Sequence, residues 1–213
     1  MRRKCKCLIV DDHPIFRKGI KDLLCEEGLC SEVVEAISAQ EALTAIRRES
    51  WDLLVLDVAL PDKHGLEVLK EAKHLCPAIP VLMLSLYPER EFALRAIKGG
   101  ASGYLTKDRA PSDFVAAVKN IVAGRRYITP SLANQMANHF SGDQSTTLHD
   151  LLSNREMEVL RLLGQGKTVS GIADAMVLSV KTVSTYRRRL LDKLRLRTTA
   201  ELIRYAVDYN LTM

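Results

Sequence analysis

Short apolar runs alternate with amphipathic segments along the first 123 residues of the chain. Each run is four to six residues long, which is typical of strands buried on both faces of a parallel sheet. The segments between them have apolar residues at helical spacing, such as Ile15, Ile20, Leu23 and Leu24 in the first. The expected strands are 7–10, 31–36, 53–56, 81–86 and 103–107, and the expected helices are 14–27, 39–49, 65–75, 89–99 and 111–123. These five β–α units predict an α/β fold, a five-stranded doubly wound parallel sheet with helices on both faces.

The alternation stops after residue 123. A weakly helical segment, 131–140, is followed by the small and polar residues SGDQSTT at 141–147. We interpret 124–150 as a linker between two domains, with 141–147 as its most flexible part. The chain is therefore expected to consist of a domain over 1–123, the linker, and a second domain over 151–213.

The second domain has the pattern of compact helices with clear start and stop signals. Ser153 and Glu156 have the spacing of a capping box, which opens a helix that runs to Leu163 and stops at GQG, 164–166. A short helix is expected over 168–176, and a longer one follows Ser179 to about residue 194. Thr198 and Glu201 form a second predicted capping box, which opens a last helix through residue 208.

Length and composition limit the class of protein. With 213 residues and 47% hydrophobic content, the chain can form one large or two small domains. No apolar run approaches the roughly 18 residues that span a bilayer, and Asp11 and Asp12 end the first run too early for a signal peptide. We therefore expect a cytoplasmic protein with no membrane partner. The five cysteines lack zinc-type spacing, which predicts reduced, partly buried thiols.

The net charge of +5 is unevenly distributed. From residue 150 onward there are 11 Lys and Arg against 7 Asp and Glu, whereas the first 149 residues have 20 against 19. Residues 181–197 alone contain seven bases and one acid. A nearly neutral domain followed by a basic one indicates that the second domain meets an anionic polymer.

Acidic residues follow two of the predicted strands. Asp11 and Asp12 come after the first strand and Asp57 after the third, so parallel strands would bring all three to one edge of the sheet. Close carboxylates repel one another unless a cation lies between them, and such oxygen ligands suit Mg²⁺. Ser85 and Lys107 end the fourth and fifth strands and could contact a phosphoryl oxygen. A carboxylate beside the metal can then attack phosphorus to form an acyl phosphate. The simpler alternatives are that Asp57 caps a loop and that Lys107 is a solvated loop lysine.

Residues 5–123 resemble the receiver domain of a two-component response regulator. The matching motifs are DDHP (11–14), LDVALPDKHG (56–65), LSLY (84–87) and GYLTKD (103–108). The resemblance implies a flavodoxin-like fold and a Mg²⁺ or Mn²⁺ cofactor. It implies that Asp57 is the phosphoacceptor, and that the metal ligands are Asp11, Asp12, Asp57 and the backbone carbonyl of Ala59. It also implies that Ser85 and Tyr104 form a switch pair and that Lys107 contacts the phosphoryl oxygen. Without the resemblance, Tyr104 could equally be an ordinary half-buried aromatic residue.

The segment 178–194, LSVKTVSTYRRRLLDKL, combines an apolar stripe with a basic face. The expected stripe consists of Val180, Val183, Leu190, Leu191 and Leu194. A cation-rich helix after a short helix and a tight turn suits a helix-turn-helix in the DNA major groove, and the alternative is a solvated charged face. Residues 151–210 resemble the LuxR/NarL-type tetrahelical DNA-binding domain, through LLSNREMEVLRLLGQGKT, IADAM, LSVKTVSTYRRRLLDKL and TTAELIRYAV. Together the two resemblances indicate the NarL/FixJ class of response regulators. KTVSTY followed by basic residues points to its GacA/BvgA-like branch.

The resemblance also implies roles within the second domain. The candidates for base contacts are Ser184, Thr185 and Arg188, and the other candidate DNA contacts are Lys181, Thr182, Arg187, Arg189 and Lys193. The sequence departs from the commoner pattern, which has Asn-Lys at Val169-Ser170, Lys at Ser184 and His at Tyr186. Two lysines are thus lost, and no target DNA sequence can be named. The candidate dimer contacts in the last helix are Leu202, Tyr205, Ala206 and Val207, which could instead pack internally.

The implied function is a transcription regulator controlled by phosphorylation. A sensor histidine kinase would phosphorylate Asp57, and the modified protein would dimerise and bind double-stranded DNA sequence-specifically. The protein would catalyse only its own phosphorylation and dephosphorylation. An aspartyl phosphatase usually carries a second Asp two residues after the nucleophile, where this chain has Ala59. No glycine-rich nucleotide-binding loop follows any predicted strand. A DNA-binding protein with a vestigial acidic site remains an alternative.

Overall fold

The computed structural model describes residues 5–140 and 148–212. It divides into two compact units, one ending at Ala137 and one beginning at Asn138, and each is described by itself. The predicted flexible segment 141–147 lies outside the described residues. In the described part of the chain, no helix combines the length and the apolar character that a bilayer span requires.

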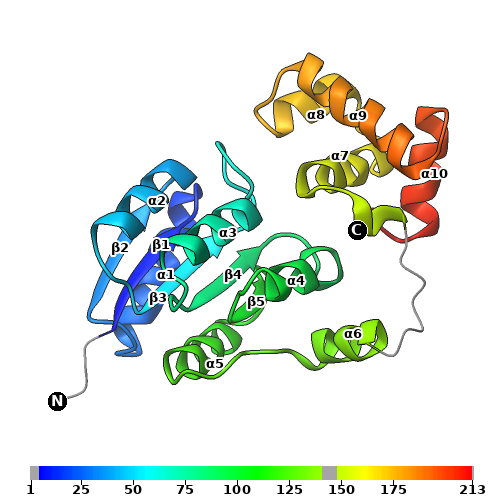
Figure 1. The fold of residues 1–213 in the computed structure, drawn as a ribbon. Helices are drawn as coiled ribbons and strands as arrows, with labels where there is room; N and C mark the ends of the chain where they lie inside the picture. The colour runs from blue at the N-terminus through cyan, green and yellow to red at the C-terminus, as the bar shows by residue number, and fades with distance from the viewer. Residues whose placement is uncertain (1–4, 141–147, 213) are drawn as a thin grey trace. The chain divides into compact units, whose positions relative to one another are not determined.

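The first unit contains the predicted five-stranded parallel sheet. Its strands are β1 (Lys6–Val10), β2 (Glu32–Ala36), β3 (Leu53–Asp57), β4 (Val81–Ser85) and β5 (Gly103–Thr106). All neighbours pair in parallel, in the order β2-β1-β3-β4-β5 (Figure 1). The order reverses at β1, which pairs with both β2 and β3. In such a sheet the crevice at this reversal, at the carboxyl ends of the strands, is where ligands bind.

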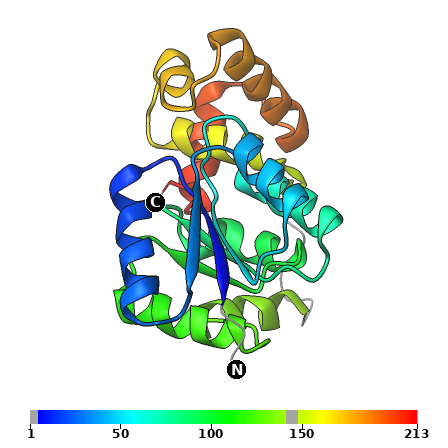
Figure 2. The ribbon, with the colours of Figure 1, turned by 90° about the vertical axis from the view of Figure 1, so that its left-hand side faces the viewer.

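Five helices connect and flank the strands. They are α1 (Pro14–Glu26), α2 (Ala39–Arg48), α3 (Gly65–Leu75), α4 (Glu89–Lys98) and α5 (Pro111–Val122). Helices α1 and α5 pack together on one face of the sheet, and α2 packs on α3 on the other (Figure 2). The apolar residues of β1 and β3 are buried between these layers, as the continuous apolar runs predict.

Ile15 departs from the predicted apolar face of α1. Ile20 and Leu24 are buried and Leu23 packs partly buried against the same core, but Ile15 is 91% exposed. Ile15 precedes Ile20 by five positions, and at about 100° per residue this offset turns Ile15 to a different side of the helix. The buried face of α1 therefore begins after its first turn.

Part of the segment interpreted as a linker packs on the first unit. Helix α6 (Pro130–Phe140) follows Tyr127, which pairs with Gly103 of β5. Leu132 of α6 is completely buried, and the Thr129 hydroxyl donates a hydrogen bond to the buried carboxylate of Glu89 (2.8 Å). These contacts attach the beginning of α6 to the start of α4.

All five cysteines are free thiols. Cys5, Cys7 and Cys30 are buried at the amino-terminal edge of the sheet, and the Sγ atoms of Cys5 and Cys30 lie 3.0 Å apart. The hydrogen bond to Cys30, together with burial, raises the pKa of the Cys5 thiol above its ordinary value. A thiol of this kind is a poor nucleophile, so these residues behave as small core side chains.

The second unit is helical. After a short 3₁₀ turn, η1 (Leu148–Leu151), come α7 (Asn154–Gly164), α8 (Val169–Ala175), α9 (Val180–Leu194) and α10 (Thr199–Asp208). The predicted capping box of Ser153 and Glu156 is present. At α10, Thr198 caps the helix, but Glu201 accepts from the backbone N–H of Arg197 (2.7 Å), one residue before the cap.

Helix α9 packs on α7 and α8, and α10 packs on α7. Val183, Leu190 and Leu194 form the buried stripe of α9 and Leu191 is partly buried, as predicted. Val180 is 51% exposed, so the expected stripe was one residue too long at its start. Val180 is the first residue of α9, and the buried residues of the helix begin at Val183.

Candidate functional site

The three predicted carboxylates meet at the carboxyl ends of adjacent strands. Val10 of β1 pairs with Leu56 of β3, which places Asp11 beside Asp57. One ligand atom each from Asp11, Asp12, His13 and Asp57 lies within 4.8 Å of the others. Asp11 and Asp57 are only 2% exposed, whereas Asp12 is at the solvent side of the cluster. The predicted convergence of the acidic residues is confirmed.

Lys107 joins the two buried carboxylates. It follows β5, where its backbone N–H donates to the carbonyl of Ser85 (2.7 Å). Its ammonium lies 2.7 Å from Asp11 Oδ2 and 2.6 Å from Asp57 Oδ2, and the lysine side chain is 5% exposed. Lys107 is therefore not the solvated loop lysine of the simpler alternative.

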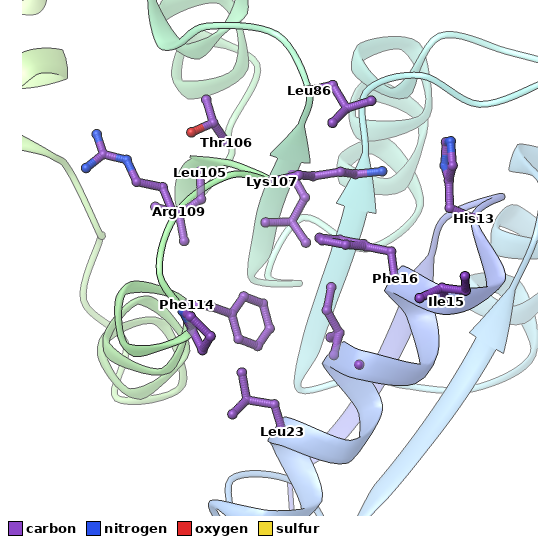
Figure 3. Close-up of a pocket in the computed structure, with 14 residues that line it drawn as sticks. His13, Ile15, Phe16, Leu23, Leu86, Leu105, Thr106, Lys107, Arg109 and Phe114 are labelled. Atoms are coloured by element: carbon purple, nitrogen blue, oxygen red, sulfur yellow. The ribbon is translucent and has the colours of Figure 1, made fainter.

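An apolar groove of about 560 Å³ borders Lys107. It lies between α1 and the β5–α5 segment, and its lining includes Phe16, Leu105 and Phe114 (Figure 3). Lys107 extends from the end of β5 toward α1, with its ammonium 4.7 Å from the centre of the Phe16 ring. Because the Lys107 side chain is largely shielded from solvent, its ion pairs are stronger than they would be at the surface.

The cluster carries more negative than positive charge. Burial raises the pKa of Asp57 to about 6, the ammonium of Lys107 opposes this rise, and the charge of Asp11 adds to it. Two buried carboxylates thus share one ammonium, with Asp12 close by. Carboxylate oxygens are the preferred ligands of hard divalent cations, so this donor set fits Mg²⁺ or Mn²⁺.

The loop that follows Asp57 lies against the acidic cluster. The N–H of Ala59 donates to Asp57 Oδ1 (3.2 Å), which holds Ala59 beside the cluster. Gly65 packs against the strand end so closely that a β-carbon there would overlap the carbonyl oxygen of Asp57. His64 is completely buried, and its Nδ1 accepts from the N–H of Leu66 (3.2 Å). Gly65 and His64 therefore shape the loop that follows Asp57.

His13 lies in the cluster, although no role was predicted for it from the sequence. Its Nδ1 lies 3.0 Å from Asp11 Oδ1 and 2.8 Å from Asp12 Oδ1. Its backbone N–H also donates to Asp11 Oδ1 (2.8 Å). The signal was its position directly after the paired aspartates in DDHP.

Ser85 and Tyr104 both contact Tyr87. Ser85 ends β4, and its hydroxyl accepts from the Tyr87 N–H (2.9 Å). The Tyr104 hydroxyl donates to the Tyr87 carbonyl (3.0 Å). Tyr104 is completely buried, which raises its pKa and keeps the phenol a neutral donor. It is therefore not a half-buried aromatic residue, and Tyr87 is a link between the two that the sequence did not reveal.

Most predicted DNA contacts lie on the solvent side of α9. Lys181, Thr185, Arg188 and Arg189 are exposed, and Thr182, Ser184 and Arg187 are partly exposed. A shallow groove is lined by Lys181, Thr182, Thr185, Tyr186 and Arg189. Tyr186 thus joins the predicted surface, and the hydroxyl of Thr182 bonds to the helix cap Ser179 (2.8 Å).

Lys193 differs from the other candidates. Its ammonium lies 2.7 Å from Glu156 Oε2 and donates to the carbonyl of Leu151 (3.3 Å). Glu156 is 2% exposed; burial acts to raise its pKa, but the Lys193 ammonium and the bonds from Ser153 lower it overall. Lys193 therefore ties α9 to the start of α7.

The candidate dimer contacts divide into buried and exposed residues. Leu202 and Ala206 are completely buried within their own unit, so the alternative of internal packing applies to them. Val207 is 52% exposed. The Tyr205 hydroxyl lies 3.0 Å from His149 Nδ1, and its ring packs on Tyr209 with centroids 4.4 Å apart.

Comparisons with known proteins agree with both sites. Residues 7–119 match the family described as response regulator receiver domain, and residues 150–206 match bacterial regulatory proteins, luxR family. The chain is 38% identical over 207 residues to the virulence-factor transcription regulator BvgA of Bordetella pertussis, covering 97% of this chain and 98% of BvgA. It is 35% identical over 208 residues to the response regulator GacA of Pseudomonas aeruginosa, covering 97% of each. A solved structure of the response regulator RcsB of Salmonella typhimurium superposes with a TM-score of 0.58 at 25% identity, covering 96% of this chain and 98% of RcsB.

The acidic cluster with its lysine lies in the segment that matches the receiver family, and the basic helix α9 lies in the segment that matches the luxR family. The similarity to BvgA and GacA extends over nearly the whole chain, so it includes both units and their order. The chain therefore belongs to the NarL/FixJ family of two-component response regulators, in which a receiver domain and a LuxR-type DNA-binding domain together regulate transcription.

Proposed function

We propose that transfer of a phosphoryl group from a sensor histidine kinase to Asp57 controls this regulator. The observation that carries the proposal is the contact of Lys107 with both Asp57 and Asp11, beside Asp12. The proposed domains are a receiver over 1–123, a linker over 124–150 and a DNA-binding domain over 151–213, and the proposed location is the cytoplasm.

In the proposed reaction, a carboxylate oxygen of Asp57 attacks phosphorus while the bond to the donor's nitrogen or oxygen breaks. The pKa of about 6 leaves Asp57 mostly ionised at pH 7, as a nucleophile must be. Asp11, Asp12, Asp57 and the carbonyl of Ala59 would hold Mg²⁺ or Mn²⁺, which supplies positive charge to the phosphoryl oxygens when bound. Lys107 keeps its ammonium beside the same oxygens. Self-phosphorylation and self-dephosphorylation are the only reactions proposed.

The effect of phosphorylation would pass from Asp57 to the segment after β4 through Ser85, Tyr104 and Tyr87. A phosphoryl group on Asp57 offers strong acceptors to the Ser85 hydroxyl, which now accepts from the Tyr87 N–H. Reorienting that hydroxyl weakens its bond to Tyr87, to which Tyr104 is also bonded. The phosphoryl group thus biases the segment after β4 between two arrangements, to the extent that each binds it differently.

The second domain would read double-stranded DNA with α9. Ser184, Thr185 and Arg188 would contact base edges, and Lys181, Thr182, Arg187 and Arg189 would contact the backbone. Lys193 could contribute only by leaving Glu156. Two copies would pair through the exposed Val207 and the neighbouring Tyr205, and bind half-sites about one helical turn apart.

The proposal is tested by incubating the protein with acetyl phosphate and Mg²⁺. We expect a mass gain of one phosphoryl group in the wild type, none in Asp57→Asn, and tighter DNA binding only when the label is present. Labelling that persists in Asp57→Asn would contradict the assignment of the phosphoacceptor. Continuous release of phosphate from diverse esters would favour the aspartyl phosphatase. DNA affinity that is the same with and without the phosphoryl label would favour a vestigial acidic site.

Arg188→Ala should weaken binding to a DNA site selected from a random duplex library by about 10- to 100-fold, because a base-contacting arginine contributes roughly 1–3 kcal/mol. Competition with a scrambled duplex should show that discrimination also falls. The matched control is Arg204→Ala, since Arg204 is an arginine of α10 whose side chain is 84% exposed. Equal losses in the two variants would show that Arg188 acts only through net charge.

A further inference from the structure

Asp62 connects the loop after Asp57 to the start of helix α2. The two oxygens of its carboxylate accept from the backbone N–H groups of Ala39 (2.9 Å) and Gln40 (3.0 Å), the first two residues of α2. These N–H groups belong to the positive end of the helix, where a carboxylate is favoured. Burial acts to raise the pKa of Asp62, but the bonds from Ala39 and Gln40 lower it overall.

The start of α2 is in turn connected to the first acidic pair. Helix α2 follows β2 after two residues, and the carbonyl of Ala36 at the end of β2 accepts from the N–H of Asp11 (3.1 Å). A continuous path of backbone and hydrogen bonds thus runs from Asp62 through α2 and Ala36 to Asp11. Asp62 and Ala59 belong to the same loop, between β3 and α3.

Other contacts of this loop lie on its own side of the site. The N–H of Val58 donates to the carbonyl of Leu84 (3.0 Å), and Val58 accepts from Gly65 (2.7 Å). Lys63 forms an ion pair with Glu71 of α3 (2.7 Å). These bonds hold the loop to β4 and α3, whereas the Asp62 carboxylate holds it to the half of the site that carries Asp11 and Asp12.

We propose that Asp62 is a positioning residue that fixes the loop carrying Ala59 at the correct separation from Asp11 and Asp12, and so sets the affinity for the divalent cation. The proposal rests on the proposed function, because it takes these residues as the metal ligands. Asp62 touches neither the metal nor the phosphoryl group; it acts through the backbone of the loop. Losing an outer contact that orients metal ligands lowers metal affinity by about 10- to 100-fold, and we expect the lower end for this exposed side chain.

The test compares Asp62→Ala with Ser38→Ala in the full chain, using Mn²⁺ binding measured by electron paramagnetic resonance. Ser38 caps the same helix end through the N–H of Glu41 (3.2 Å) and makes no described bond to the loop. Both variants should lower the unfolding midpoint by similar amounts. Only Asp62→Ala should weaken Mn²⁺ binding, by about tenfold, and its labelling by acetyl phosphate should recover at saturating Mg²⁺.

Asp62→Asn provides a second variant, because its single amide oxygen can replace only one of the two bonds. Its Mn²⁺ affinity should lie between those of the wild type and Asp62→Ala. If Asp62→Ala binds Mn²⁺ as the wild type does, or if Ser38→Ala is equally impaired, Asp62 only caps α2 and the proposal is wrong. Failure of the proposed function would look different, since wild-type protein would then bind Mn²⁺ no better than Asp12→Ala.

Discussion

Replacing Asp57 with asparagine should stabilise the metal-free protein at pH 7 by about 2–3 kcal/mol, although it removes an ion pair. Burial raises the pKa of Asp57 from 3.8 to about 6, so the folded state binds this proton more tightly than the unfolded state does. The tighter proton binding therefore stabilises the folded wild type fully below pH 3.8, the pKa of Asp57 in the unfolded chain. This stabilisation is lost as the pH rises through about 6, the pKa of Asp57 in the folded state. Asparagine is neutral at every pH, and Lys107 keeps its contact with Asp11.

Urea unfolding in EDTA at pH 5 and pH 7.5 measures this effect. The gain of Asp57→Asn over the wild type should be larger at pH 7.5, because most of the Asp57 in folded wild-type protein is already protonated at pH 5. Asp22→Asn is a suitable control, since Asp22 lies on the exposed side of α1. A variant that is less stable than the wild type at both pH values would show that the ion pair with Lys107 outweighs the cost of burial.

The sheet and the acidic cluster could be predicted because both follow from local rules. A continuous apolar run such as Leu53–Leu56 predicts a strand buried on both faces, and parallel strands bring Asp11 and Asp57 to one edge. The site residues that were not predicted, His13 and Tyr87, reach the site through local backbone contacts that the hydrophobic pattern does not show. His13 turns back onto the aspartates before it, and Tyr87 links Ser85 and Tyr104 through its own backbone.

Other differences come from partners that are distant in sequence. The charge pattern of α9 includes Lys193 in the basic face, but Glu156, 37 residues earlier, neutralises it. The beginning of the weak helix α6 is attached to the first unit because Thr129 forms a hydrogen bond with Glu89, 40 residues away. Neither pairing can be predicted from the neighbouring sequence, because each of these polar residues on its own would be expected at the solvent-exposed surface. The same limit applies to Leu202 and Ala206, whose apolar character fits an interface and a core equally well.

Lys107→Ala should destabilise the metal-free protein by about 3–5 kcal/mol at pH 7, the range for removing one partner of a buried ion pair. The variant leaves Asp11 and Asp57 close together, 2% exposed and without the ammonium that both contact. Adding Mg²⁺ should restore more stability to Lys107→Ala than it gives the wild type, because the cation replaces the missing positive charge in the folded state. Urea unfolding with EDTA and with Mg²⁺ measures both quantities.

Lys63→Ala is the matched control, because Lys63 lies as close to Glu71 (2.7 Å) as Lys107 does to Asp11, but at the surface. An exposed pair of this kind contributes about 0–1 kcal/mol and should not respond to Mg²⁺. The double variant Asp57→Asn/Lys107→Ala should lose less stability than the sum of the separate effects predicts, because Asp57→Asn removes an ion pair with Lys107 from the wild type but not from Lys107→Ala. If Lys107→Ala unfolds like Lys63→Ala, burial does not govern the Lys107 ion pairs, and the acidic site is more hydrated than its low exposure indicates.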